Sequence, residues 1–242
     1  MKYILLFLFI GTLSIANSQT VRLHEDVNAL DIEKPKHGEN MANFDHWYVD
    51  YGFFAMPSDG EGADLRYLFS HTFSFGYRYK RKLNNYFAVG TSASYMLIIY
   101  DLEQKVGKKI PDEVLHKKEK FNMNTVYGDI YFRINFGKRG NIIGKYIDFG
   151  AYGDWAFNVK NLIVDKVENT GNANSYNEVK TVRRNLNYYN PISYGTIVRI
   201  GINRYSVFGM YRISDFFSTD FKTSISKTEL SRLSVGLQIG LH

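Results

Sequence analysis

The residues in this sequence that could do chemistry are charged side chains. They lie within segments in which polar and apolar residues alternate. Each occupies the small or polar row of a segment whose other row is large and apolar. The four acids and four arginines are Asp50, Arg78, Asp129, Arg133, Asp148, Asp154, Arg199 and Arg212. Charges enclosed by a narrow ring of strands are expected to pair, because an unpaired buried charge is costly. We therefore expect a structural charge network, with a narrow ion path as the alternative.

Enzyme and metal chemistry find little support in the sequence. The six histidines are scattered, and the only His beside a nucleophile is His71, which follows Ser70. Neighbours in a strand point to opposite faces, so this pair is a weak candidate for a base and nucleophile. The chain has no Cys, no HExxH and no calcium-loop pattern. We expect no enzyme activity, no cofactor and no metal.

The elements that must position the charges are strands, and the clearest is residues 233–241, LSVGLQIGL. Every odd position in it is large and apolar, and every even position is small or polar. Side chains in a strand alternate between two faces, so this segment has one apolar face and one narrow polar face. An outward apolar face with inward small or polar residues is what a barrel in lipid requires.

Seven earlier segments repeat this alternation. They are 46–56, 66–80, 86–100, 121–136, 145–159, 180–202 and 205–217. The chain is therefore predicted to be all-β, an eight-stranded antiparallel up-and-down transmembrane β-barrel. Pro191 lacks a backbone donor and predicts a bulge or an edge within the sixth segment. The alternative is a soluble sandwich or lipocalin-like barrel, whose outer face should carry many more Lys and Glu than these Gly/Ser rows do.

The connections between the predicted strands alternate between long and short. This asymmetry is typical of outer-membrane barrels, with short periplasmic turns and long extracellular loops. The long connections 101–120 and 165–178 mix both charge signs, so we expect solvated surfaces or partner contacts there. Aromatic residues are expected in two girdles, with Tyr86, Phe136, Tyr146 and Tyr205 at the inner rim and Phe69, Tyr95, Trp155 and Phe157 toward the outer one.

The first residues predict export. Lys2 precedes a short apolar run, and Ala16-Asn17-Ser18 has the small-x-small form of a cleavage site. We expect a signal peptide at 1–18, a polar periplasmic extension at 19–45 and the barrel at 46–242. The predicted location is the bacterial outer membrane, in contact with its lipid and lipopolysaccharide. The net charge of +6 is mild and lies largely in connections, so no nucleic-acid partner is expected.

Residues 73–95, FSFGYRYKRKLNNYFAVGTSASY, have a strand-turn-strand pattern of the form G-x-x-Y-x-x-x-L. With the signal and the eight-strand alternation, the chain over 46–242 resembles the small outer-membrane β-barrel family that includes PorT-like proteins. The resemblance implies architecture and no active residues. The chain departs from the usual outer-membrane pattern at its last residues, Leu241-His242, where an aromatic residue is usual.

The resemblance implies a non-enzymatic accessory or anchoring role in an outer-membrane complex. PorT-like proteins are implicated in type IX secretion and gliding, so the expected partners are other outer-membrane or periplasmic proteins. The alternative is an independent small-solute channel. A more distant alternative is a small outer-membrane hydrolase, for which Ser70 and His71 would be the candidates.

Overall fold

The computed structural model describes residues 37–58, 62–137, 140–168, 176–184, 186–224 and 228–242. Residues 35–242 form one compact unit. The prediction of an all-β chain is confirmed, because the unit consists of one antiparallel sheet. Its strands are β1 (Asn43–Phe54), β2 (His71–Lys82), β3 (Phe87–Leu102), β4 (Lys118–Phe136), β5 (Lys145–Glu168), β6 (Tyr176–Arg184), β7 (Ile192–Ile202), β8 (Tyr205–Arg212) and β9 (Leu233–Leu241). The helical segments among the described residues are a 3-10 turn, η1 (Tyr67–Phe69), and α2 (Thr219–Ser224).

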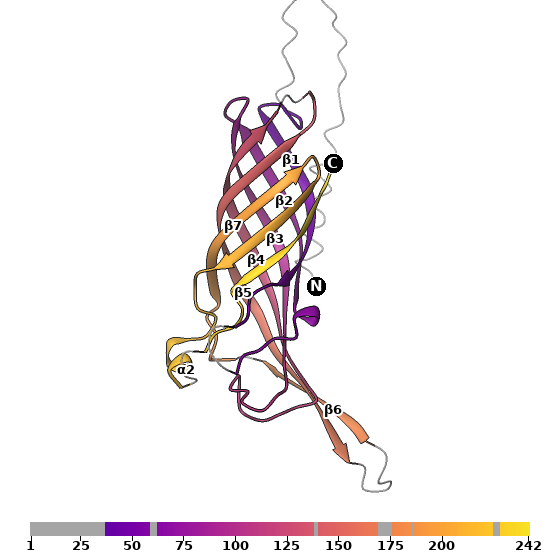
Figure 1. Cartoon of the computed structure of the whole chain (residues 1–242), viewed down its shortest axis with the longest axis vertical. Helices are drawn as coiled ribbons and strands as arrows, with labels where there is room; N and C mark the ends of the chain where they lie inside the picture. Colours follow the sequence, from indigo (N-terminus) through magenta and orange to yellow (C-terminus); the bar gives the residue numbers. More distant parts are fainter. Residues whose placement is uncertain (1–36, 59–61, 138–139, 169–175, 185, 225–227) are drawn as a thin grey trace, which may run out of the picture. The chain divides into compact units, whose positions relative to one another are not determined.

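The sheet closes on itself through eight strands, in the order β1-β2-β3-β4-β5-β7-β8-β9. The ring closes where β9 pairs with β1, from Trp47 opposite Leu241 to Phe54 opposite Ser234. Every pair of neighbours is antiparallel, and the strands run obliquely around the ring (Figure 1). No helix in the described part of the chain is long and apolar enough to cross a membrane.

The ninth strand, β6, lies outside the ring. It pairs only with the second half of β5, from Lys160 opposite Arg184 to Glu168 opposite Tyr176. These two segments, 160–168 and 176–184, are called the β5–β6 extension below. In Figure 1 the extension projects from the same end of the ring as α2, where the long connections lie. The short turns at 83–86 and 203–204 lie at the other end.

The predicted sixth strand, 180–202, is wrong as a single element. It is two strands, β6 and β7, separated by residues 185–191. Pro191 has no amide hydrogen to donate and lies just before β7, where its carbonyl accepts a hydrogen bond of 2.7 Å from the Ala156 amide. The described side chains of β6, residues 177–184, are all exposed, so this strand has no apolar row for alternation to reveal.

Other boundaries also move. The fifth strand extends from the predicted 159 to 168, so part of the predicted loop at 165–178 is strand. β1 begins at Asn43, inside the predicted extension 19–45, of which residues 19–36 lie outside the described residues. η1 replaces the start of the predicted second strand, and β8 ends at Arg212 instead of 217. The predicted signal peptide at 1–18 lies outside the described residues.

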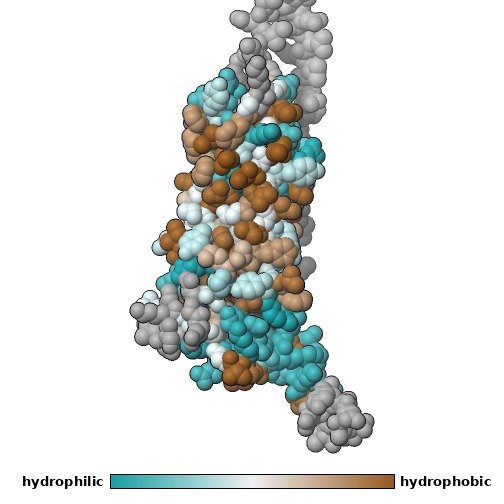
Figure 2. All heavy atoms as spheres, in the orientation of Figure 1, coloured by the Kyte–Doolittle hydropathy of each residue, from teal (hydrophilic) through white to brown (hydrophobic). Residues whose placement is uncertain are grey.

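The alternation in the strands separates two environments. Large apolar side chains such as Trp47, Phe75, Ile130, Trp155 and Leu237 are 44–69% exposed on the outside of the ring. Figure 2 shows such hydrophobic residues spread over the strands, with hydrophilic ones gathered toward the end that carries the extension. The opposite row is buried inside the ring. Tyr146, predicted at the inner aromatic girdle, belongs to this inner row and is 4% exposed.

At the long-connection end, aromatic side chains fill the ring. Tyr100 and Phe121 come from β3 and β4, and Phe216 and Phe217 come from the connection after β8. The Phe216 and Phe217 rings meet edge-on at 4.8 Å, and Phe216 lies 5.8 Å from Tyr100 and 6.0 Å from Phe121. We call these four residues the aromatic cluster. Phe216, Phe217 and Leu230, which flank the predicted polar loop at 218–227, are buried and belong to the apolar core at this end.

Candidate functional site

The charge network inside the ring is centred on Arg133 and Asp148, which lie opposite each other on β4 and β5. The Arg133 guanidinium donates two hydrogen bonds to the Asp148 carboxylate, at 2.6 and 2.8 Å. Arg78 from β2 approaches the same carboxylate at 3.9 Å across the ring. Arg133 also stacks over the Tyr146 ring, with its guanidinium carbon 3.6 Å from the ring centre. The planar arginine fork suits this buried two-point contact.

A second pair joins strands that are not neighbours. Arg199 of β7 forms an ion pair with Asp129 of β4. The Tyr127 hydroxyl donates a 2.8 Å hydrogen bond to the same carboxylate. Tyr131 lies between the two pairs, with the guanidinium carbons of Arg78, Arg133 and Arg199 5.1, 5.5 and 5.9 Å from its ring centre. The part of the interior toward the short turns is therefore a packed arrangement of arginines, carboxylates and tyrosine rings.

The other predicted residues are also buried, but they do not complete the expected pairing. Arg212 pairs with Glu229 at 3.4 Å, and donates to the Leu230 carbonyl at 3.0 Å. Asp50 and Asp154 form no ion pair within 4.0 Å to any residue that the structure describes, and one carboxylate oxygen of each lacks a hydrogen-bond partner there. The expectation that the eight charges would pair among themselves is therefore wrong for Asp50, Asp154 and Arg212.

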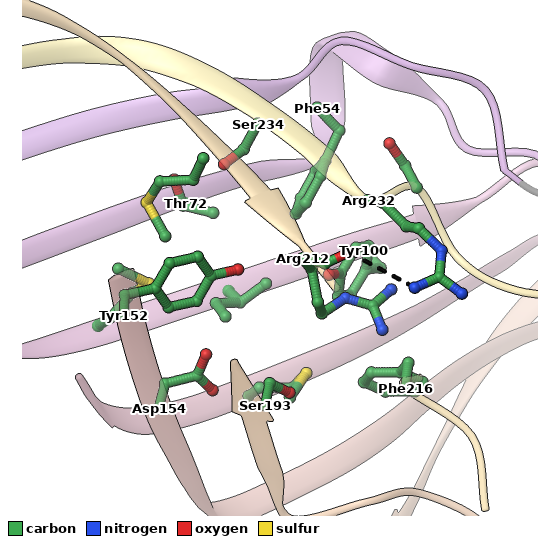
Figure 3. Close-up of a pocket in the computed structure, with 15 residues that line it drawn as sticks. Phe54, Thr72, Tyr100, Tyr152, Asp154, Ser193, Arg212, Phe216, Arg232 and Ser234 are labelled. Carbon is green, nitrogen blue, oxygen red and sulfur yellow. Dashed lines mark hydrogen bonds between the residues drawn. The ribbon is translucent and has the colours of Figure 1, made fainter. Parts of the chain in front are cut away.

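Asp154 borders a small interior cavity beside the aromatic cluster. The cavity measures about 30 Å³, the space of one or two water molecules. In Figure 3, Asp154 and Ser193 face it from one side, while Arg212 and Tyr100 lie across from them. An ordered water here would satisfy the free Asp154 oxygen and the free Arg212 Nε. The cavity is too small for an organic substrate.

The structure separates the groups of the Ser70 and His71 pair. The Ser70 hydroxyl is fully buried, where it accepts a 2.9 Å hydrogen bond from the Asp101 amide. The His71 ring lies over Tyr51, 5.4 Å away, with Nδ1 3.1 Å from the Phe69 carbonyl. No hydrogen bond joins the two side chains among the described residues.

Two charge clusters at the long-connection end were not predicted from the sequence. Asp101, fully buried, accepts two hydrogen bonds of 2.8 Å from Arg66 and pairs with Lys120 at 2.7 Å. The hydrogen bonds to Asp101 raise the pKa of the Arg66 guanidinium above its usual value. In the second cluster, Lys108 pairs with Glu119 at 2.6 Å, and both side chains are buried. Alternation carries no signal for connections, so only the density of charge in 101–120 marked this region.

A closed interior is a scaffold more than a reaction site. Its arginines are paired, its tyrosines are packed, and its cavity has the size of water. Neither a family model nor a curated protein matches this chain. The features left to indicate a function are therefore the two surfaces of the ring and the segments that project from it.

Proposed function

We propose that this protein is an outer-membrane β-barrel that serves as an accessory or anchoring subunit of a protein complex, without enzyme activity of its own. One observation carries the proposal: the ring has the reverse of the polarity of a soluble protein. Many charged and hydroxyl side chains are buried inside, together with an aromatic and aliphatic cluster at one end, and large apolar side chains cover the outside of all eight strands. Such an outer surface is favourable in lipid and costly in water.

The filled interior favours an anchoring role over conduction. The Arg133–Asp148 pair and the Arg78 side chain that reaches the same carboxylate occupy the interior toward the short turns, and the aromatic cluster fills the end that carries the long connections. A barrel of eight strands encloses little space beyond its own side chains, whereas a barrel with a water-filled pore needs about twice as many strands. The alternative of a small-solute channel therefore lacks a supporting opening in the described interior.

The projecting end favours a protein partner. Three contacts tie the 103–117 connection to the β5–β6 extension: Lys117 with Glu178, His116 with Asp165 at 2.7 Å, and Arg183 with Asp112 at 3.6 Å. The hydrogen bond from Lys117 lowers the pKa of Glu178. This bracing gives the extension a fixed surface, which reduces the ordering cost of binding a partner.

The test is a mild-detergent pull-down from outer membranes with the full chain, followed by mass spectrometry. A stoichiometric protein partner is expected. The variant K180E/R184E reverses two exposed charges on β6, and it should lose the partner. The matched control K145E/R204E reverses two exposed charges at the opposite end, and it should keep the partner.

Three results would contradict this proposal. Recovery of the protein alone, at wild-type yield and with the fold intact, would remove the accessory role. Steady single-channel currents from the purified protein would favour the channel instead. Recovery in a soluble fraction after cell breakage would contradict the membrane location itself.

A further inference from the structure

An imidazole nitrogen of His116 and a carboxylate oxygen of Asp112 lie 4.0 Å apart beside the β5–β6 extension. His116 lies in the connection after β3, and its Nδ1 is 2.7 Å from the Asp165 carboxylate. A carboxylate accepts, so Nδ1 carries the proton, and in the neutral ring Nε2 presents a lone pair. Nε2 is buried and has no hydrogen-bond partner among the described residues, and the side chain is only 9% exposed. An Asp112 carboxylate oxygen lies 4.0 Å from it.

That separation is too long for a hydrogen bond and suited to a metal ion. An imidazolium bridging both carboxylates would need its second contact near 2.7–2.9 Å, as charge-assisted hydrogen bonds require. Two tetrahedral zinc ligands at ~2.0–2.2 Å from the ion lie about 3.3–3.6 Å apart. A shift of about half an ångström by the Asp112 carboxylate, whose side chain is 35% exposed, would bring its oxygen and Nε2 to that separation. Glu119 supplies a third oxygen, and the three ligand atoms all lie within 4.8 Å of one another.

The surroundings have the arrangement that metal ligands usually need. Asp165 fixes the His116 tautomer and ring orientation, as a carboxylate does behind a zinc-bound histidine. Asn161 donates a 2.8 Å hydrogen bond to the other Glu119 oxygen and so orients that carboxylate. Arg183 contacts the second Asp112 oxygen at 3.6 Å. Each ligand is therefore oriented by a partner on one side. The remaining Asp112 oxygen also accepts a 3.2 Å hydrogen bond from the Val114 amide, and the remaining Glu119 oxygen contacts Lys108.

Lys108 holds the cation position next to Glu119. Its ammonium nitrogen lies 2.6 Å from Glu119 Oε2 and 3.7 Å from Asp112 Oδ1, and it makes no hydrogen bond to His116 among the described residues. A metal ion at the common point would displace this ammonium from Glu119. The lysine would keep the Val114 carbonyl, to which it already donates a hydrogen bond of 2.5 Å.

We propose that Asp112, His116 and Glu119 form a site for a divalent transition-metal ion, with Zn²⁺ as the ion that the nitrogen and oxygen donor set suits. Lys108 competes with the ion for Glu119. An occupied site joins the connection after β3 to β5 through the His116–Asp165 contact, so the ion would act as a structural clamp. The site is independent of the proposed function, because it needs neither the membrane nor a partner.

The test is titration of the full chain, purified in mild detergent, with Zn²⁺ by calorimetry and with Co²⁺ by its visible absorption. One ion per chain is expected. H116A should abolish binding, and D165N should weaken it about tenfold through the lost orientation of the ring. K108M should bind about tenfold more tightly, because the competing charge is removed. H37A is the matched control: it removes a histidine that also contacts an aspartate, Asp45, at the other end of the ring, and it should bind like the wild type.

Circular dichroism shows whether H116A is folded. If H116A misfolds, E119Q replaces it in the test, because glutamine retains the shape of the glutamate side chain. Equal affinity of the wild type and H116A would overturn the proposal, as would an equal loss in H37A. Binding by K108M that is no tighter than in the wild type would also overturn it, because the site would then lie elsewhere.

Discussion

At the scale of single residues, the notable feature is how much charge the interior holds. Arg78, Arg133 and Arg199 are each 1–2% exposed, and two aspartates serve all three. Removing one partner from such a group costs more than the pair contributes, because the remaining charge is left buried and uncompensated. The shared carboxylate of Asp148 is therefore the most sensitive single position.

Asp148→Asn tests that sensitivity. The change leaves Arg133 and Arg78 facing a neutral amide, and we expect a loss of about 3–5 kcal/mol in the free energy of unfolding. Urea unfolding in detergent measures it. Asp220→Asn, at an exposed aspartate of α2, should change the same quantity by less than about 0.5 kcal/mol. A loss of similar size in both variants would show that the Arg133–Asp148 pair has no special role.

Tyr188 provides a test in pH. It lies in the connection before β7, stacked on Phe221 at 4.8 Å, and burial raises its pKa from 10.0 to about 12. A raised pKa means that the folded state favours the neutral phenol, so this contribution is complete below pH 10 and is lost as the pH rises toward 12. Tyr188→Phe cannot ionise. Between pH 9 and pH 12, the unfolding free energy of both proteins should fall, and the fall should be about 1–2 kcal/mol smaller in Tyr188→Phe than in the wild type. One pKa unit corresponds to about 1.4 kcal/mol, and the expected difference is reduced because the side chain is partly exposed. Parallel pH curves would contradict this assignment.

The residues that sequence alternation found are those within strands. All eight predicted charges are buried, because alternation states which side of a strand a residue occupies. Their partners were less predictable. Glu229 comes from the connection before β9, and Lys108 meets Glu119 because the connection after β3 returns to the start of β4. Contacts of that kind depend on tertiary structure and leave no local pattern.

At the scale of elements, the closing seam between β1 and β9 depends on close backbone approach. Gly52 and Gly236 are opposite each other in this pair. A Cβ added to Gly236 would lie 2.2 Å from the Tyr51 carbonyl oxygen and 2.5 Å from the Gly52 Cα. These contacts are with backbone, so a side-chain rotation cannot relieve them.

Gly236→Ala should therefore weaken the seam, at a cost of about 1–3 kcal/mol in unfolding free energy. Gly209→Ala is the matched control on the neighbouring strand β8, where an added Cβ would meet nothing within 4 Å. We expect the control to be neutral or slightly stabilising, because alanine restricts the unfolded chain. Thermal unfolding in detergent compares the two. If G236A were more stable than the wild type, the β1–β9 seam would have space for a Cβ atom, contrary to these backbone distances.

The strands themselves were predictable in proportion to how cleanly they alternate. β9 has the predicted bounds, 233–241, because one face is uniformly large and the other small or polar. β6 was merged with β7 because its side chains are exposed and carry no apolar row. β5 continues nine residues past the predicted end at 159. Leu162, Ile163 and Val164 there are consecutive apolar residues, so alternation is lost although Ile163 and Val164 are buried. Hydrophobic periodicity reports a buried face, and it fails where a strand has none.

At the scale of the whole ring, the exposed apolar surface allows a test of whether lipid or water surrounds the strands. Ile130→Arg changes a 69% exposed side chain in the middle of β4. In a membrane, arginine near the midplane costs about 2–4 kcal/mol, whereas on a soluble surface it is nearly neutral. We expect I130R to reduce unfolding stability in lipid vesicles by that amount. Val106→Arg, at a 92% exposed residue in the connection after β3, should be neutral. A neutral I130R would argue against lipid contact.

The ion pairs of the interior also couple distant strands. Arg78 to Asp148 joins β2 to β5, and Arg199 to Asp129 joins β7 to β4, so each contact spans strands that are not neighbours. A partly zipped sheet that keeps these strands apart would leave Arg78 and Arg199 without a carboxylate, while Arg133 and Asp148 stay paired across the neighbouring strands β4 and β5. We therefore expect intermediates in which some strands are paired and others are not to be poorly populated. Assembly and opening of the ring should each occur in one concerted step, and the folded ring should be slow to exchange its interior amide protons.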